Sequence, residues 1–150
     1  MVGKQFESQG IAKHGAKMVS AVANANVPKI TAIIGASYGA GNYGMCGRAY
    51  SPRFLYMLPS SKINVMGGQQ ASEVLALVSF KNGEDQSVID KFKSGIQKEY
   101  SDKGDAYFST ARLWDDGIVK ASDLRRILGM SVATSLNAKI EPTQAGVFRF

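Results

Sequence analysis

The first third of the chain combines one long helical pattern with short apolar runs. Apolar residues recur at helical spacing over 10–26, which predicts a helix that Pro28 ends. Most of the remaining residues in this segment are small, so we expect the helix to pack closely against a sheet. The positions that define its apolar face are Ile11, Gly15, Met18, Val19 and Val22.

Three apolar runs are too short for helices and predict buried strands. They cover residues 29–35, 54–58 and 63–66, and glycine or proline lies close to the ends of each. A second helix is predicted over 39–48, where Ser51 and Pro52 prevent a longer one.

The second half of the chain is predicted to be mainly helical. Helices are expected over 69–79 and 87–100, with a polar loop at 81–86 between them. The positions expected to face inward are Ala71, Val74, Leu75 and Val78 in the first helix, and Val88, Ile89, Phe92 and Ile96 in the second.

Turns and a last helix complete the pattern. Turns are predicted at 101–105 and 115–117, on either side of a short mixed stretch at 107–114. A brief strand is expected at 118–119. Ser122 is the expected N-cap of a helix that ends near Leu136. The tail is predicted to dock through Val147, Phe148 and Phe150.

This order of helices and strands predicts an α/β fold. Two of the predicted strands run into helices through glycine, at 35–41 and at 67–68. Such turns suggest repeated layers with ligand sites at the carboxyl ends of strands.

Composition limits the class of protein. A chain of 150 residues is one domain or a piece of a larger one, and it can bury a real core. No apolar run reaches the roughly 18 residues of a membrane-spanning helix, and the first residues resemble neither a signal nor a transit peptide. A single cysteine favours a reducing compartment. One histidine and one cysteine cannot build a zinc site, so no metal is expected.

The net charge of +6 is concentrated in one stretch. No acidic residue occurs between Glu7 and Glu73, whereas the rest of the chain is balanced. This stretch is either a solvated basic face or a surface for an anionic partner. Nucleic acid is not expected, because no clustered basic run or nucleic-acid module is present. The basic residues are Lys13, Lys17, Lys29, Arg48, Arg53 and Lys62.

The glycine turn after the first strand is the main candidate for chemistry. A strand, a glycine turn and a helix start together present backbone N–H groups that bind a phosphate, a carboxylate or an oxyanion. Residues 39–44 also fit the dinucleotide pattern G-x-G-x-x-G, although no acidic residue follows at the required distance. A third interpretation is that the glycines only allow close packing.

No side chain stands out as a general base or nucleophile. His14 is expected to be exposed or half-buried, and Cys46 to be a small core residue. Asp115 and Asp116 precede a glycine, a pattern typical of a turn rather than an acid/base pair. Any chemistry is therefore expected to depend on backbone N–H donors.

Four segments resemble one known family. Residues 10–19, 37–54, 65–71 and 111–118 are similar to the carboxyltransferase subunits of biotin-dependent acyl-CoA carboxylases, and the form at 38–47 is nearest to the methylcrotonyl type. The resemblance implies a crotonase-like ββα superhelix. It also implies that residues 1–150 are the C-terminal part of one such domain, a fragment with little activity alone. The family usually has a longer helical segment near 77–86, and Asp-Pro in place of Lys120 and Ala121.

The resemblance further implies a mechanism and a site. Carboxybiotin on a separate alpha subunit would carboxylate an acyl-CoA, which for the methylcrotonyl type is 3-methylcrotonyl-CoA in leucine degradation. Biotin itself would be the base, and ATP would be used only by the partner. The N–H groups of Ala40 and Gly41 would form the oxyanion hole, and biotin would also meet Tyr38, Gly39 and Tyr43. Beta subunits of the family form homo-oligomers, and in eukaryotes they lie in the mitochondrial matrix, otherwise in the cytoplasm.

Overall fold

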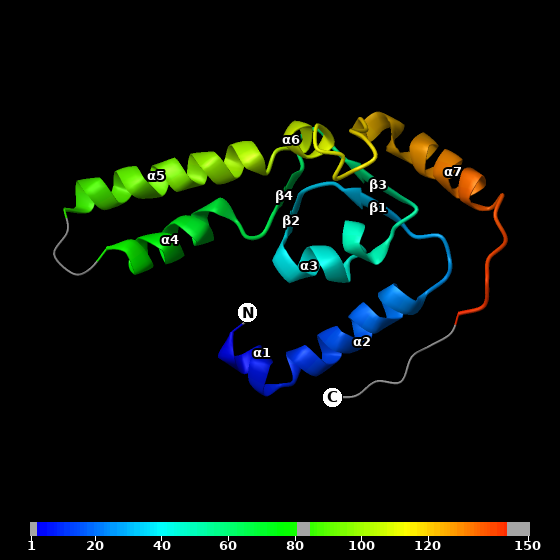
Figure 1. The fold of residues 1–150 in the computed structure, drawn as a ribbon, viewed down its shortest axis with the longest axis horizontal. Helices are drawn as coiled ribbons and strands as arrows, with labels where there is room; N and C mark the ends of the chain where they lie inside the picture. Colours follow the sequence, from blue (N-terminus) through cyan, green and yellow to red (C-terminus); the bar gives the residue numbers. More distant parts are fainter. Residues whose placement is uncertain (1–2, 81–84, 144–150) are drawn as a thin grey trace.

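The computed structural model describes residues 3–80 and 85–143, and its centre is built from two successive strand–strand–helix units. The first consists of β1 (Ile30–Ile33), β2 (Ala36–Tyr38) and α3 (Gly39–Gly44), and the second of β3 (Phe54–Met57), β4 (Lys62–Asn64) and α4 (Gly68–Ser79) (Figure 1). This repeated order confirms the α/β prediction. The predicted strand over 29–35 is shorter than expected, and β2, which we did not predict, follows it.

The two units lie side by side because their strands pair in parallel. β1 pairs with β3 from Ile30–Phe54 to Ile33–Met57, and β2 pairs with β4 through a register that brings Tyr38 opposite Asn64. Parallel strands require a crossover, and residues 39–53 supply it through α3 and the 3-10 turn Arg48–Tyr50. As a result, β2 and β4 end at the same edge.

A small apolar core lies under these strands. Ile33, Leu55, Met57 and Ala106 are buried together, with Ile63 and Ile118 packed against them. Ile118 forms a parallel bridge to Met57, so the brief strand expected at 118–119 is reduced to one bridge beside β3. A third segment of the chain, which contains Ile118, thereby joins the layer formed by β1 and β3.

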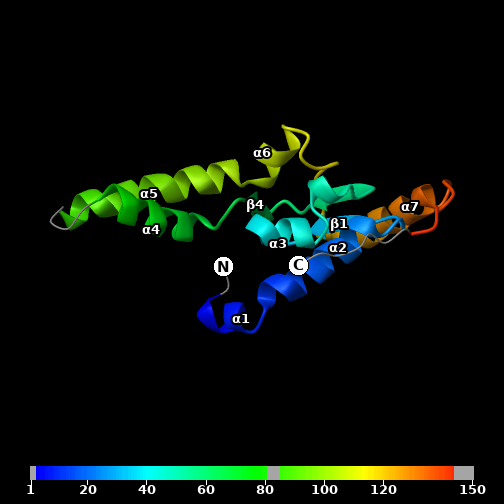
Figure 2. The same ribbon diagram turned by 60° about the horizontal axis from the view of Figure 1, so that its bottom comes forward.

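Helices α2 (Ile11–Asn24) and α7 (Leu124–Ser135) lie on different parts of this centre (Figures 1 and 2). We expected α2 to pack on a sheet, but it lies along α3 instead. A Cβ atom on Gly44 would come within 2.8 Å of the Met18 side chain, so α3 contacts α2 closely through this glycine. α7 is tied to β3 by the hydrogen bond between the hydroxyl groups of Tyr56 and Ser131, 2.8 Å apart.

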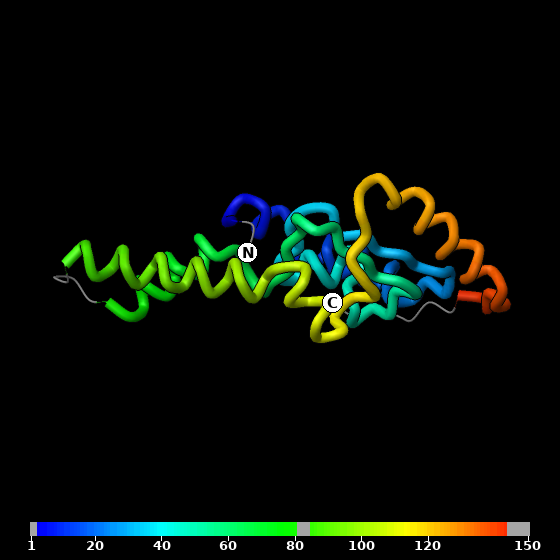
Figure 3. Tube along the Cα trace, turned by 90° about the horizontal axis from the view of Figure 1, so that it is seen from above, coloured from blue at the N-terminus to red at the C-terminus, as the bar shows by residue number. Residues whose placement is uncertain are grey.

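α4 and α5 (Gln86–Lys103) form a hairpin that projects away from the strands in every view (Figures 1, 2 and 3). Small residues bring the two helices together: Ala71 is fully buried, and Ser72 accepts a hydrogen bond from Gln97 at 3.0 Å. Phe80 and Phe92 pack edge to face with ring centroids 5.2 Å apart.

The prediction of which α4 residues face inward is largely wrong. Only Ala71 is buried, whereas Val74, Leu75 and Val78 are 51%, 37% and 79% exposed. The reason is that, among the described residues, α4 packs mainly on α5, and it does so through its small positions. In α5, Ile89, Phe92 and Ile96 are half-buried as expected, but Val88 is exposed.

Several predicted boundaries also differ. α3 ends at Gly44 rather than near 48, because the chain turns at Met45 and Cys46, where the φ of Cys46 is 62°. A helical turn, α1 (Lys4–Ser8), was not predicted, and α5 continues to Lys103 through part of the expected turn at 101–105. The loop residues 81–84 and the tail residues Val147, Phe148 and Phe150 lie outside the described residues.

The N-caps come from aspartates rather than from the expected serine. Ser122 lies in a 3-10 turn, and α7 begins at Leu124 after Asp123, without a side-chain cap. Asp85 caps α5 by accepting a hydrogen bond from the N–H of Ser87 at 3.1 Å. Hydrogen bonds from the backbone and the hydroxyl group of Ser87 lower the pKa of Asp85.

The turn at Asp115 and Asp116 is a structural junction, which confirms the prediction of turn chemistry. The buried carboxylate of Asp115 accepts hydrogen bonds from the hydroxyl groups of Ser109 and Thr110 at 2.6 and 2.7 Å, and from the N–H of Gly117 at 3.0 Å. Ser109 and Thr110 belong to α6 (Ala106–Thr110), so this carboxylate fixes α6 to the turn.

We therefore expect Asp115→Ala to lower the free energy of unfolding by about 2–4 kcal/mol, because buried donors lose their acceptor. Urea denaturation measures this change. Asp123→Ala is the matched control, since Asp123 faces Arg126 at 3.8 Å in an exposed ion pair that contributes about 0–1 kcal/mol. Equal effects of the two substitutions would contradict this account of the turn.

Candidate functional site

The glycine turn lies at the shared edge where β2 and β4 end. β2 ends at Tyr38 and α3 begins at Gly39, so the first N–H groups of α3 have no acceptor within their own helix. Tyr38, the N-cap residue, makes no side-chain capping hydrogen bond. Among the described residues, no hydrogen bond from the N–H groups of Ala40 or Gly41 is found. These two groups are available to an acceptor from outside.

Gly39 lets the turn approach the neighbouring strand. Its φ is +59°, a left-handed conformation that other residues rarely adopt. A Cβ atom at this position would lie 3.0 Å from the carbonyl oxygen of Val65, just beyond β4. Gly41 differs, because a Cβ atom there would meet nothing within 4 Å. Only Gly39 is therefore required by the backbone geometry.

An open pocket of about 750 Å³ lies in front of this turn. One side consists of the turn and the end of β4, with Gly39, Ala40, Tyr43 and Val65. The structure thus brings together three of the predicted site residues. Tyr38 lies elsewhere, in a smaller pocket of about 210 Å³ against α4 and α5, and Gly41 contributes no lining surface to either pocket.

The opposite side of the pocket was missed by sequence reasoning. It comes from α6 and the residues after it, and we call Phe108, Arg112 and Trp114 the aromatic wall. The rings of Phe108 and Trp114 pack edge to face with centroids 5.8 Å apart, and the guanidinium of Arg112 lies 3.3 Å from the centroid of the Phe108 ring. Trp114 is the one tryptophan in the sequence, but no local pattern placed it opposite α3.

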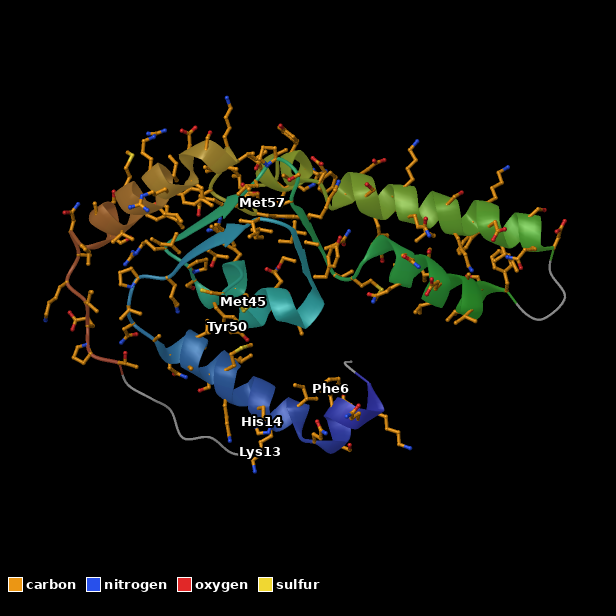
Figure 4. The ribbon with its side chains drawn as sticks, turned by 180° about the vertical axis from the view of Figure 1, so that it is seen from behind. Phe6, Lys13, His14, Met45, Tyr50 and Met57 are labelled. Atoms are coloured by element: carbon orange, nitrogen blue, oxygen red, sulfur yellow. The ribbon has the colours of Figure 1, made fainter. Side chains whose placement is uncertain are left out.

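The side chains lining this pocket offer no general base. Its described lining contains no carboxylate, imidazole or thiol, and its charged members are Lys103 and Arg112. His14 is exposed on α2 and points away from α3, and Cys46 is buried, as expected (Figure 4). Within residues 3–80 and 85–143, no three His, Cys, Asp or Glu side chains gather as a metal site would require. The pocket therefore supplies apolar contact, positive charge and backbone donors.

The basic stretch is partly used inside the molecule. Arg48 pairs with Asp116 at 3.1 Å, Lys62 pairs with Asp105 at 3.4 Å, and Lys29 donates to the carbonyl oxygen of Val22 at 2.8 Å. These contacts reduce the number of its charges that are available to an outside anion.

Comparison with known proteins decides the family. Residues 1–146 match the family model described as the carboxyl transferase domain. The chain belongs to this family. Residues 39–44 also fit the dinucleotide-binding pattern, but the match identifies the chain as a carboxyl transferase domain instead of a dinucleotide-binding module.

The relatives of this carboxyl transferase domain are longer proteins. The biotin-dependent 3-methylcrotonyl-coenzyme A carboxylase beta1 subunit of Mycobacterium tuberculosis is 52% identical over 158 residues, which cover 99% of this chain and 29% of the relative. The probable mitochondrial methylcrotonoyl-CoA carboxylase beta chain of Drosophila melanogaster is 55% identical over 159 residues, which cover 99% and 27%. The chain spans less than a third of the length of these relatives.

Solved structures show the same fold. The beta subunit of P. aeruginosa geranyl-CoA carboxylase matches with a TM-score of 0.83 and 43% identity, over 100% of this chain and 30% of that one. The transcarboxylase 12S structure, described as a hexamer assembly with substrate binding to a multienzyme core, matches with a TM-score of 0.81 and 28% identity, over 99% and 28%. The expected crotonase-like carboxyltransferase fold is confirmed. No helix in the described residues is long and apolar enough to span a membrane.

We expect Gly39→Ala to lower the free energy of unfolding by at least about 1–2 kcal/mol, because alanine would be forced into a left-handed conformation against the Val65 carbonyl group. Gly41→Ala is the matched control. Alanine fits there without contact and favours the helix, so stability is expected to be unchanged or up to about 1 kcal/mol higher. Urea denaturation measures both variants, and a stable Gly39→Ala variant would show that the turn does not need glycine.

Proposed function

We propose that this chain forms the biotin side of a carboxyltransferase site, in which a carboxyl group passes from carboxybiotin to an acyl-CoA. One observation carries the proposal: the N–H groups of Ala40 and Gly41 have no acceptor among the described residues, and Ala40 lines an apolar pocket whose described side chains include no base. Such a site suits a reaction in which the ligand itself handles the proton and the protein stabilises negative charge.

The residues present fit the biotin group. Its ureido oxygen is a hydrogen-bond acceptor, and its ring and side chain are largely apolar. Ala40 and Gly41 offer donors, while Tyr43, Phe108 and Trp114 offer apolar surface. Biotin, when bound, supplies the carboxyl group and then a basic nitrogen.

The N–H groups of Ala40 and Gly41 would hold the ureido oxygen of biotin and stabilise negative charge on it. They are held in place before the reaction, because Gly39 fixes the start of α3 against Val65. The dipole of this short helix turn adds to the effect in the same direction. The apolar surface that lines the pocket lowers the local dielectric constant beside these donors, which strengthens their hydrogen bonds.

The substrate and partners follow from the relatives. Several relatives between 48% and 55% identical are named as methylcrotonyl-type carboxylase beta subunits, so we propose 3-methylcrotonyl-CoA as the acceptor. The partner would be a biotin-carrying alpha subunit, within a beta-subunit oligomer. Relatives from three eukaryotes are named mitochondrial, which supports the mitochondrial matrix if the source is eukaryotic.

The decisive experiment is fixation of labelled bicarbonate by a complete beta subunit that carries this sequence, assembled with its biotin-bearing partner and ATP. We expect acid-stable label with 3-methylcrotonyl-CoA. Geranyl-, propionyl- and acetyl-CoA are the comparison substrates, and label with one of these alone would retain the reaction but change the acceptor. No label with any thioester, from a folded assembly, would contradict the proposal and favour a non-catalytic interaction segment.

The oxyanion hole is tested by removing one donor. In the complete subunit, Gly41→Pro deletes an N–H group within the first turn of α3 and is expected to lower kcat about 10²- to 10³-fold. Gly41→Ala keeps the N–H group and is expected to retain most activity. Binding of acyl-CoA, measured by calorimetry, should be the same in both variants. Similar kcat values for the two would show that this donor does not act in the reaction.

A further inference from the structure

Arg48, in the 3-10 turn that follows α3, contacts the segment that carries Trp114 of the aromatic wall. Its Nε donates a hydrogen bond to the carbonyl oxygen of Trp114 at 3.1 Å, and its Nη2 lies 3.1 Å from the carboxylate of Asp116. A guanidinium can make both contacts at once because its donors are fixed in a plane. Arg48 therefore joins the segment that carries the oxyanion hole to the segment that carries Trp114.

Asp116 anchors this arrangement to the sheet. Its other carboxylate oxygen accepts the N–H of Leu55 at 2.8 Å, and its own N–H donates to the carbonyl oxygen of Leu55 at 2.7 Å. Leu55 is buried in the core. The position of Trp114 thus depends on the core through Asp116 and on α3 through Arg48.

The aromatic wall exposes side-chain surface that a ligand in the pocket can contact. Trp114 is 45% exposed although it packs on Phe108, and it lines the same pocket as Ala40. Tyr107 is more exposed, at 63%, but it does not line the pocket. A half-exposed tryptophan that shares an apolar pocket with a backbone donor is suited to cover one face of a flat ring bound there.

We propose that the aromatic wall binds the ring of biotin opposite the oxyanion hole, with Trp114 as the binding residue and Arg48 as the residue that positions it. This inference rests on the proposed function and extends it to a second side of the pocket. The positive charge of Arg112, stacked on Phe108, lies on the same side and suits the carboxyl group that biotin carries. The wall holds the ring, while Ala40 and Gly41 hold its oxygen.

The first test is binding of free biotin to the complete beta subunit without its partner, measured by calorimetry. We expect Trp114→Ala to raise the Kd for biotin about tenfold and to leave the Kd for acyl-CoA unchanged. Phe108→Leu, a milder change to the same wall, should raise the Kd for biotin in the same direction. Tyr107→Ala is the matched control and should change neither constant, because Tyr107 does not line the pocket.

The second test separates positioning from general stability. Arg48→Lys can pair with Asp116 but cannot also hold the Trp114 carbonyl group, so it should raise the Kd for biotin as Arg48→Met does. In the Trp114→Ala background, Arg48→Met should add no further loss, because both substitutions remove the same contact. Two results would overturn the positioning role of Arg48. One is a wild-type Kd for biotin in Arg48→Lys, and the other is a further rise in this Kd when Arg48→Met is added to Trp114→Ala.

The outcomes distinguish this inference from the proposed function. If the wild-type subunit binds biotin and fixes label, but Trp114→Ala and Phe108→Leu leave the Kd for biotin unchanged, the wall does not contact biotin and the inference fails alone. If the folded wild-type assembly neither binds biotin nor fixes label with any thioester, the proposed function fails and this inference fails with it.

Discussion

The parallel pairing of β2 with β4 is the constraint on which the candidate site depends. Since the two strands run in the same direction and are paired in register, Tyr38 and Asn64 end them at the same edge. The turn after β2 then lies beside the residues after β4, close enough that Gly39 approaches the Val65 carbonyl group. Without this pairing, the turn that carries Ala40 would not lie beside the end of β4, which lines the same pocket.

The turn at Asp115 and Asp116 links three other parts of the chain. Asp115 ties the turn to α6, and Asp116 ties it to β3 and to Arg48. Adjacent aspartates before a glycine favour a turn over an acid/base pair. Their partners decide between these, because every hydrogen bond described for them fixes backbone or positions a neighbouring segment.

Much of the fold could be predicted from the sequence because local signals were strong. Apolar runs beside proline or glycine located β1, β3 and β4, and helical spacing located α2, α4, α5 and α7. Failures occurred where burial depends on partners distant in sequence. The apolar stripe of α4 predicted a buried face, but its contact with α5 uses Ala71 and Ser72, so Val74 and Val78 stay exposed. β2 was missed because three residues carry too little pattern.

The sequence by itself determined the family and located the glycine turn of the candidate site. The segment at 38–47 is long and specific, and its glycines predict a turn from strand to helix. Only the tertiary structure decided what faces that turn. Phe108 and Trp114 follow Ala40 by more than sixty residues, and they reach the pocket through the pairing of Met57 with Ile118 and the contact of Arg48 with Trp114. Contacts of this kind leave no periodic trace in a sequence, since they depend on how separate elements pack.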